Sequence, residues 1–350
     1  MKSLKKVICI FIALMLLLAA PAALAIAAPE DMSTKNVLLI EAETGTVLYE
    51  KNADMQAKPA STTKIMTCIL ALENGNLDDI VTVPSVTSSG STMGIRRGEK
   101  MSLRSLIYGM MLVSGNDAAE AVAVHIGGTK DDFVKMMNEK AQSLGMTGTN
   151  FVAPSGLEKE KHYTTARDFA RLAQYAMYES PQKNNFRIIV NTKTYTVKDS
   201  SSKVYELITT NRLLYTSETG KSANVEYKYA IGVKTGMTPA SLECLVSAAE
   251  KNGVTLILVQ FGEPDSDTRF KLAAELFEYG FENYVTRDAS ALNLASTVEV
   301  SVQNASMENG ETGLLALNVQ FENQPVNCLK ADWDRMMNDS SAITSTIIPV

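Results

Sequence analysis

The chain has 350 residues, of which 33 are basic and 39 acidic, so its net charge near pH 7 is −6. An acidic chain without a basic stripe argues against nucleic acid as a partner and against electrostatic docking on an anionic membrane. Its two histidines and four scattered cysteines show no metal-ligand spacing, so we expect neither a metal nor another cofactor.

Residues 1–27 predict a cleavable signal peptide. A start containing Lys2, Lys5 and Lys6 precedes an apolar run, and alanines at 23, 25 and 27 supply an A-x-A cleavage pattern. An uncleaved membrane anchor is the alternative, but the apolar run is short for a bilayer span. Cleavage removes three basic and no acidic residues, which brings the net charge to −9. We therefore expect an exported protein, acting in the cell wall or periplasmic space.

Three cysteines remain after cleavage, and they do not form a dense disulfide framework. Cys68 lies in an apolar helical segment, and Cys244 alternates with Leu242 in a strand-like run. We expect both to be buried small apolar side chains. The sequence leaves open the redox state of Cys68, Cys244 and Cys328.

The first part of the mature chain is a hairpin followed by helices. Residues 37–52 read as two β-rich runs around a glycine-containing turn. Residues 103–128 are helical on both sides of a break at Ser-Gly-Asn. Further helices are expected after Ser61, over 131–145, and over 164–178 with Thr164 or Thr165 as the cap.

Strand patterns return late in the chain, over 229–236, 241–250 and 254–262, and a helix follows over 268–281. Strands therefore come early and late, with helices between them. This order predicts an α/β fold in which one sheet takes strands from both ends of the domain and packs against helices.

Residues 285–350 have a different character. Valines alternate at 298, 300 and 302, and apolar residues alternate at 315, 317 and 319. Alternation with a period of two predicts a small β-rich domain. The expected division is a signal peptide at 1–27, a catalytic domain at 28–284 and a small β-rich C-terminal domain at 285–350.

Three short motifs occur in order. Ser61-Thr-Thr-Lys64 opens an apolar helix, Ser114-Gly-Asn116 breaks the helical hairpin, and Lys234-Thr235-Gly236 ends a strand-like run. Ser-x-x-Lys alone is a weak signal, because it occurs four times in the chain. The other three lie in the signal peptide or in loop-like contexts. The ordered set is far more specific than any of its members.

The residue types suit acyl transfer through a covalent intermediate. Ser61 and Lys64 share a helix face, so a lysine made neutral by burial, with Lys234 nearby, can take the proton of the Ser61 hydroxyl. Ser114 can pass a proton to the leaving group, and Asn116 can hold a substrate amide. His125 and His162 lie outside the motifs, and we expect both, like Asp117, to be structural.

The edge of the strand at 234–238 can pair with an extended substrate. Backbone N–H groups of Ser61 and Met237 can then hold the oxyanion. Lys234, the Thr235 hydroxyl and an arginine suit the terminal carboxylate of a substrate. The backbone of Gly236 lies between these groups on the same strand.

The ordered motifs resemble those of the penicillin-recognising serine acyl-transferases. Segments such as "PASTTKIMT", "MLVSGNDAAEAVA", "FVAPSGL" and "GVKTGMT" are similar to the D-alanyl-D-alanine carboxypeptidases of low molecular mass, over residues 35–283. The resemblance implies a β-lactamase/transpeptidase-like domain with an antiparallel sheet packed against helices. It also implies removal of the terminal D-alanine from peptidoglycan stem peptides, and acylation by β-lactams as inhibitors. Arg269 matches the carboxylate-binding arginine of the family, although an arginine at a helix start can also be a solvated surface group.

The family usually ends in an amphipathic, membrane-anchoring helix, whereas this chain ends in "SSAITSTIIPV". We therefore expect no strong membrane anchor. Two other functions use similar residues. A serine β-lactamase of this kind needs a glutamate in an E-x-x-L-N segment, and none occurs between Asn116 and Lys234. A catalytically silent wall-binding protein would be expected to have lost Ser61, Lys64 or Lys234.

Overall fold

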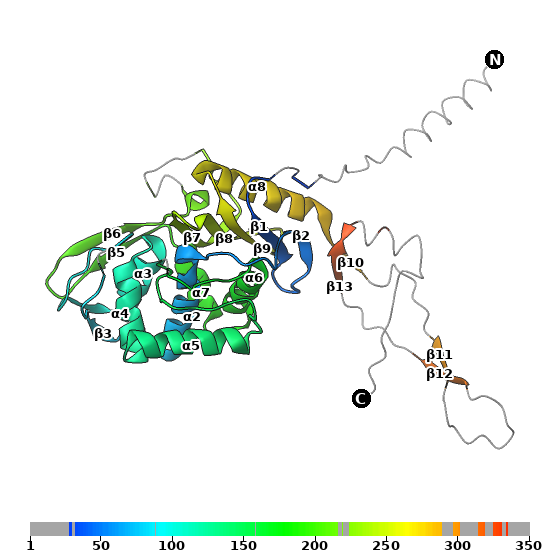
Figure 1. Ribbon diagram of the computed structural model, residues 1–350. Helices are drawn as coiled ribbons and strands as arrows, with labels where there is room; N and C mark the ends of the chain where they lie inside the picture. Colours follow the sequence, from blue (N-terminus) through cyan, green and yellow to red (C-terminus); the bar gives the residue numbers. More distant parts are fainter. Residues whose placement is uncertain are drawn as a thin grey trace, which may run out of the picture.

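In the computed structural model, a β-sheet lies between helices on both of its faces (Figure 1). The structure describes residues 28–29, 32–87, 89–157, 159–215, 219, 224–288, 297–301, 314–318, 325–330 and 334. The predicted signal peptide, residues 1–27, lies outside the described residues. Among the helices of the described part, none is both long and apolar enough to cross a membrane.

The central sheet has five antiparallel strands in the order β2-β1-β9-β8-β7. The early strand β1 pairs with the late strand β9, from Asn36 opposite Phe261 to Glu41 opposite Leu256. This confirms the predicted hairpin over 37–52 and the prediction that both ends of the domain share one sheet. The strands are β1 (Asn36–Glu41), β2 (Val47–Lys51), β7 (Ala230–Thr238), β8 (Leu242–Lys251) and β9 (Val254–Glu263).

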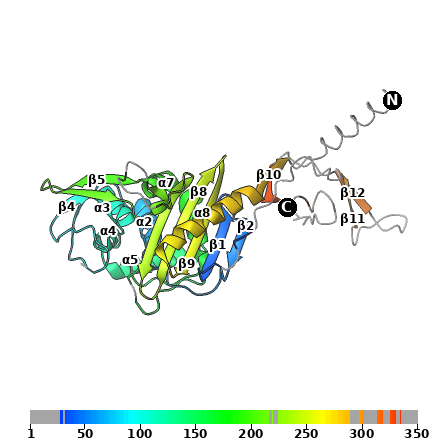
Figure 2. The ribbon, with the colours of Figure 1, turned by 90° about the horizontal axis from the view of Figure 1, so that it is seen from above.

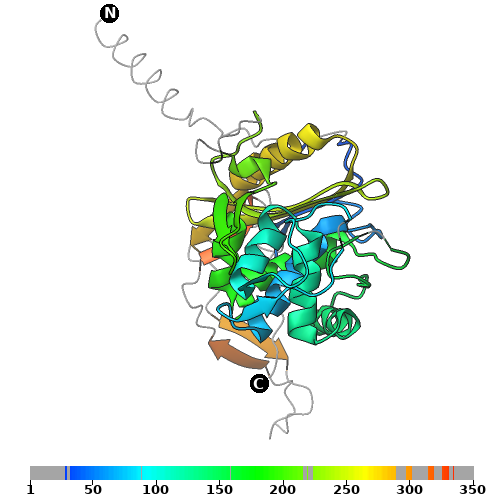
Figure 3. The same cartoon turned by 90° about the vertical axis from the view of Figure 1, so that its left-hand side faces the viewer.

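Helices cover both faces because successive side chains of these strands are apolar and point to opposite sides. Val37 of β1 packs with Phe270 of α8 (Ser266–Asn283), whereas the adjacent Leu38 packs in the larger core on the other face. Figures 2 and 3 show α8 along one face and the remaining helices on the other. Those helices are α2 (Lys64–Asn74), α3 (Leu103–Leu112), α4 (Asn116–Gly127), α5 (Lys130–Ser143), α6 (Ala166–Gln174) and α7 (Lys183–Asn191).

The predicted helix breaks and caps are largely confirmed. The break between α3 and α4 falls at Ser114 and Gly115, and Ser114 has a φ of 59°, which non-glycine residues seldom adopt. Thr165 caps α6, since its hydroxyl accepts a hydrogen bond from the N–H of Asp168. The helix expected over 164–178 continues beyond α6 as a π-helical turn, η2 (Tyr175–Glu179). The helix α8 extends to Asn283 rather than 281.

The sequence analysis missed one helix and two pairs of strands that precede β7 in the chain. The helix α7 has only nine residues, too few for its apolar positions to define a helical period. A hairpin of β5 (Thr194–Lys198) and β6 (Val204–Ile208) follows it, and β3 (Ile80–Thr82) pairs with β4 (Lys100–Ser102). These short strands lie outside the central sheet, so their sequence patterns are weak.

Cys68 and Cys244 are fully buried, and neither forms a disulfide within the described part of the chain. Burial raises the pKa of both thiols, to about 11 for Cys244. Their prediction as small buried apolar side chains is confirmed. Cys328 lies in β13 (Pro325–Leu329).

The described residues of the C-terminal segment form four further strands. β11 (Thr297–Ser301) pairs with β12 (Leu314–Asn318), and these are the two alternating runs predicted to be strands. β10 (Tyr284–Asp288) begins where α8 ends, and it pairs with β13. The change of pattern near residue 284 therefore coincides with the end of α8. The division into domains at 284 and 285 stays a prediction.

Candidate active site

The residues Ser61 and Lys64 lie where a single 3₁₀ turn, η1 (Ala60–Thr63), joins α2. Lys64 is 0% exposed, so its amine is removed from solvent. Its Nζ lies 2.8 Å from Ser61 Oγ, 2.7 Å from Asn116 Oδ1 and 2.7 Å from the carbonyl oxygen of Ser155. The predicted pairing of hydroxyl and amine is therefore present, with two further acceptors.

Burial lowers the pKa of Lys64 well below its ordinary value, and the nearby charge of Lys234 lowers it further. Asp117 opposes this shift. A neutral amine has two N–H donors and one lone pair. Asn116 Oδ1 and the Ser155 carbonyl can accept the two N–H groups, which leaves the lone pair for the Ser61 hydroxyl. The arrangement therefore suits a lysine that removes a proton from Ser61.

The turn between α3 and α4 fixes the amide of Asn116. Its Nδ2 donates to the carbonyl of Ser89 at 2.9 Å, so Oδ1 points toward Lys64. Ser114, buried in the strained turn, lies two residues away. Asn116, the first residue of α4, thus contacts Lys64 directly, and Ser114 belongs to the turn that leads into it.

Asp117 has the structural role that we expected. Its carboxylate accepts hydrogen bonds from the N–H groups of Met93, Gly94, Ile95 and Ala118, at 2.8 to 3.1 Å. These bonds tie the segment before β4 to the start of α4. The charge is thereby fixed at the helix N-terminus, where a carboxylate is favourable.

The strand β7 forms the opposite wall of the site. A Cβ on Gly236 would lie 3.0 Å from the backbone nitrogen of Ser61. Strand β7 therefore passes close to η1, which is called the catalytic turn below because it carries Ser61. Lys234 is buried, and its Nζ donates to the carbonyl of Thr235 at 3.1 Å. Burial, with a contribution from Arg269, lowers the pKa of Lys234 to about 7. Met237, by contrast, is 60% exposed.

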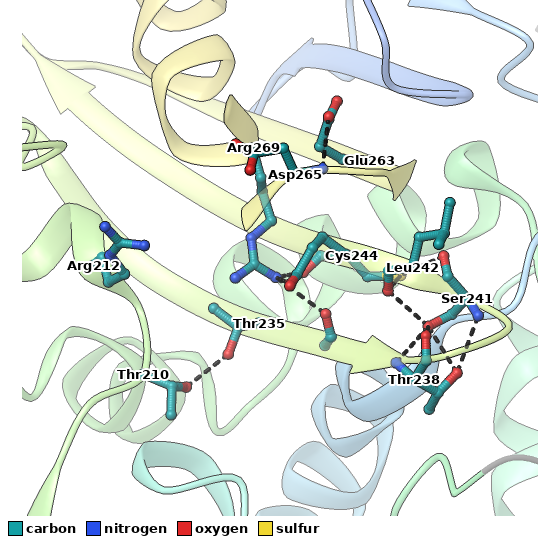
Figure 4. Close-up of polar contacts among 12 residues, drawn as sticks. Thr210, Arg212, Thr235, Thr238, Ser241, Leu242, Cys244, Glu263, Asp265 and Arg269 are labelled. Carbon is teal, nitrogen blue, oxygen red and sulfur yellow. Dashed lines mark hydrogen bonds and ion pairs between the residues drawn. The ribbon is translucent and has the colours of Figure 1, made fainter. Parts of the chain in front are cut away.

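Arg269 reaches the site from the first turn of α8, behind the strand, and is 5% exposed (Figure 4). Its Nη1 donates to the carbonyls of Gly236 at 3.1 Å and Cys244 at 2.9 Å, and lies 2.6 Å from a carboxylate oxygen of Glu243. Among the described residues its Nε is buried without a hydrogen-bond partner. Arg269 is therefore a buried cation attached to β7 rather than a solvated surface group.

Thr235 and Arg212 lie on the other side of this guanidinium (Figure 4). The Thr235 hydroxyl is 2.6 Å from that of Thr210. Arg212 pairs with Asp267, and its charge contributes to lowering the pKa of Arg269. Lys234, Arg269 and Arg212 therefore surround Thr235 with positive charge, which is partly offset by Glu243 and Asp267.

The sequence analysis missed several contributors to the site. Ser155 acts through its backbone carbonyl, so its residue type gave no signal. Gly156 has a φ of 79°, and a Cβ there would lie 1.8 Å from the carbonyl oxygen of Ala60. The sequence Ala153-Pro-Ser-Gly156 indicates a turn, but it does not indicate that this turn contacts η1. Glu243 and Arg212 belong to no motif, and only the fold brings them to Arg269.

His162 lies closer to the motif than expected, although its contacts are structural. Its Nδ1 accepts from the N–H of Val152 at 3.1 Å, so Nε2 carries the proton and donates to Thr63 Oγ1 at 2.9 Å. Burial lowers the pKa of His162 to about 4. The neutral ring therefore holds the catalytic turn against the segment 150–163. His125 pairs with Asp79 at the far end of α4.

Because the pKa of His162 is lower in the folded chain than its ordinary 6.5, the unfolded state binds the proton more tightly. This contribution to stability is complete above pH 6.5 and is lost as the pH falls toward 4. Between pH 7 and 5 we expect a loss of about 2 kcal/mol in the free energy of unfolding from this group. His162→Gln keeps a donor for Thr63 but cannot titrate in this range. Measured by urea unfolding, its free energy of unfolding should therefore fall by about 2 kcal/mol less between pH 7 and 5 than that of the original protein. Equal losses in both proteins would contradict the assignment.

Comparison with known proteins agrees with the motifs. A family model described as Peptidase_S11, D-alanyl-D-alanine carboxypeptidase, matches residues 23–265. The D-alanyl-D-alanine carboxypeptidase DacF of Bacillus subtilis is 35% identical over 260 residues, which cover 72% of this chain and 63% of DacF. The D-alanyl-D-alanine carboxypeptidase of Streptomyces sp. strain K15 is 36% identical over 255 residues, covering 68% of this chain and 84% of the relative. The chain thus spans less than two thirds of DacF.

Two solved structures are also similar. A mutant of the Streptomyces K15 DD-transpeptidase has a TM-score of 0.65 at 34% identity, covering 72% of this chain and 99% of that one. The D-alanyl-D-alanine carboxypeptidase DacD from Francisella tularensis has a TM-score of 0.69 at 27% identity, covering 89% of this chain and 84% of that one. The fold is therefore that of the DD-peptidases, as the sequence predicted. The chain belongs to the D-alanyl-D-alanine carboxypeptidase family, Peptidase_S11.

Proposed function

We propose that the chain is a serine-type D-alanyl-D-alanine carboxypeptidase that removes the terminal D-alanine from peptidoglycan stem peptides. The observation that carries this proposal is the buried Lys64 amine, 2.8 Å from the Ser61 hydroxyl and bonded to Asn116 and Ser155. Family membership supports the same activity. Export by the signal peptide would bring the enzyme to its substrate outside the cytoplasm.

Acylation begins when neutral Lys64 takes the proton of Ser61. Ser61 Oγ then attacks the carbonyl carbon of the penultimate D-alanine, and the N–H groups of Ser61 and Met237 stabilise the oxyanion. The proton returns through Ser114 to the nitrogen of the leaving D-alanine, and the C–N bond breaks. Water then hydrolyses the ester and restores Ser61. A β-lactam would acylate the same oxygen.

The substrate lies along β7 in this proposal. Its terminal carboxylate is held by Lys234, the Thr235 hydroxyl and Arg269, and its backbone pairs with the strand edge at Gly236 and Met237. The unpartnered Nε of Arg269 and the cationic surroundings of Thr235 support this orientation. Arg212, outside the sequence motifs, adds a second guanidinium near the same hydroxyl. Asn116 holds the substrate amide next to the scissile bond.

Family membership favours the carboxypeptidase over the β-lactamase, and the presence of Ser61, Lys64 and Lys234 in one site argues against a silent wall-binding protein. The Streptomyces K15 relative is described both as a carboxypeptidase and as a DD-transpeptidase. Both reactions share the acyl-enzyme and differ only in whether water or an amine attacks it. Products formed with and without an added acceptor amine distinguish them.

Ser61 should form the covalent intermediate. Purified protein is expected to release D-alanine from a peptide ending in D-Ala-D-Ala and to attach a labelled β-lactam to Ser61. Ser61→Ala should abolish both, whereas Ser33→Ala, in a serine near the start of β1, should leave labelling intact. Labelling of the Ser61→Ala protein at the rate of the original would sink the assignment.

Lys64 should be the base in acylation. Lys64→Arg places a permanently protonated guanidinium at the position, so acylation should fall by about 10²-fold or more. Lys64→Gln is the companion variant, since its amide can still donate toward Asn116 or Ser155 without acting as a base. The measurement is the rate of β-lactam labelling at pH 7, with thermal unfolding to verify the fold. Near-normal rates in either folded variant would mean that the base lies elsewhere.

Arg269 should recognise the substrate carboxylate. Arg269→Ala should lower kcat/KM for a D-Ala-D-Ala peptide with a free terminal carboxylate, by an amount equivalent to roughly 2–3 kcal/mol of transition-state stabilisation. The effect should be much smaller for the same peptide with an amidated C-terminus. These four values of kcat/KM, for two proteins and two peptides, form a double-mutant cycle. Because Arg269→Ala also leaves Glu243 unpaired, the same cycle is measured in proteins that carry Glu243→Gln. Equal losses on the acid and the amide in both backgrounds would show that Arg269 only supports β7.

A further inference from the structure

A groove of about 780 Å³ lies beside the catalytic turn, and the proposed chemistry does not use it. One wall is the start of β1, and a second is the segment that leads into η1. The loop 159–163, which follows the Gly156 turn, forms a third wall, and the turn between β7 and β8 at Ala240 and Ser241 forms a fourth. Phe261 and Gly262 of β9 complete the lining, so five segments far apart in sequence meet at this groove, and its Lys58 lies three residues before Ser61.

The groove is basic, although the chain as a whole is acidic. Among the described residues that line it, four are lysines and one is an acid, and all five side chains are exposed: Lys35, Lys58, Lys159, Lys161 and Glu160. The whole chain, by comparison, has a net charge of −6. Lysines gathered around a hollow attract an anion and concentrate it there.

A second, smaller cavity lies between this groove and the catalytic turn. Ala60 and Thr238 line it, and it shares Lys58, Lys159 and His162 with the larger groove. The charge of Lys159 contributes to lowering the pKa of His162, whose ring bonds Thr63 of η1. Lys159 of the groove therefore lies close enough to act electrostatically on His162, which contacts η1.

The direction of the substrate decides which part of it would reach the groove. In the proposed function the terminal carboxylate lies at Lys234 and Thr235, and the scissile carbonyl at Met237. Upstream residues then continue past Thr238 toward Ser241. An extended chain advances about 3.3 Å per residue, so about three residues upstream span roughly 10 Å along this path. The groove therefore lies on the side of the acyl donor, not of the leaving D-alanine.

We propose that this groove is a subsite for a carboxylate carried by the acyl donor upstream of the scissile bond, and that it favours a donor with a free carboxylate over its amidated form. The inference rests on the proposed function, because that function sets the substrate direction. Exposed lysines act as flexible point charges, so they suit a carboxylate whose position varies between substrates.

The test compares two peptides that end in D-Ala-D-Ala and differ only at the third residue upstream of the scissile bond, which is glutamate in one and glutamine in the other. The quantity measured is the ratio of kcat/KM for the acid to that for the amide, with D-alanine release as the assay. In the original protein the ratio should exceed 1 and fall toward 1 when the salt is raised to 1 M, since exposed charges are screened.

Variants of the groove should change this ratio in opposite directions. Lys159→Gln is expected to lower it by about 3-fold, and Lys58→Gln with Lys159→Gln by about 10-fold, as for a few exposed charge pairs. Glu160→Gln removes the one acidic side chain among the described residues of the groove, so it should raise the ratio. Lys135→Gln, an equally exposed lysine on α5, is the matched control and should leave the ratio unchanged.

Acid-to-amide ratios that stay equal in all these proteins would overturn the subsite. A second outcome would also overturn it. If the Lys58→Gln, Lys159→Gln variant lost binding of inorganic polyphosphate while its acid-to-amide ratio stayed unchanged, the groove would serve a polymeric anion instead. Failure of the proposed function looks different, since no protein would then release D-alanine from either peptide. Labelling by a β-lactam, which has no upstream carboxylate to offer, checks that each variant keeps an intact catalytic turn.

Discussion

The burial of one lysine governs the arrangement of this site. An amine in the interior is stable only if its donors are bonded or its proton is lost; the donors of Lys64 are bonded, and burial lowers its pKa well below the ordinary value. Asn116 and the Ser155 carbonyl accept from it, and Ser61 completes its surroundings. Removing any of these acceptors would leave a buried donor without a partner. The three segments that supply them are therefore held to α2 by the same burial that lowers the pKa of the amine.

The two layers of helices explain how these segments meet. The start of the domain supplies β1, η1 and α2, and its end supplies β7, β8, β9 and α8. Pairing of β1 with β9 joins the two ends, and β7 then lies against η1. A Cβ at residue 156 would overlap the carbonyl oxygen of Ala60, and one at residue 236 would be tight against the nitrogen of Ser61, which favours glycine at both positions. On the far face, α8 carries Arg269 to the carbonyls of Gly236 in β7 and Cys244 in β8, so this edge of the sheet is supported from behind.

Positive charges follow one another through the site. Burial is the main cause of the lowered pKa values of Arg269, Lys234 and Lys64, and the charges of Arg212, Arg269 and Lys234, respectively, lower them further. Glu243 and Asp267 offset part of this repulsion at its outer end. Binding of a substrate carboxylate near Thr235 would relieve it further. The charges proposed to bind the anionic end of the substrate are thus linked electrostatically to Lys64, and the lysines of the groove beside η1 extend the positive region beyond Thr238.

The sequence by itself determined the local parts of this protein. Ser61 and Lys64 lie one helical turn apart, Ser114 and Asn116 share one turn, and strands β11 and β12 form in the two alternating runs, because each pattern depends on neighbours in the chain. Buried apolar runs also predicted the central sheet and its covering helices. The tertiary structure alone decided what depends on distant backbone: the Ser155 carbonyl at Lys64, the Gly156 approach to Ala60, and the pairing of Arg269 with Glu243. A carbonyl group is common to every residue, and an exposed-looking glutamate on a strand gives no sign of its partner, so no residue pattern could have announced these contacts. The groove is of the same kind, since its lysines come from segments that only the folded sheet brings together.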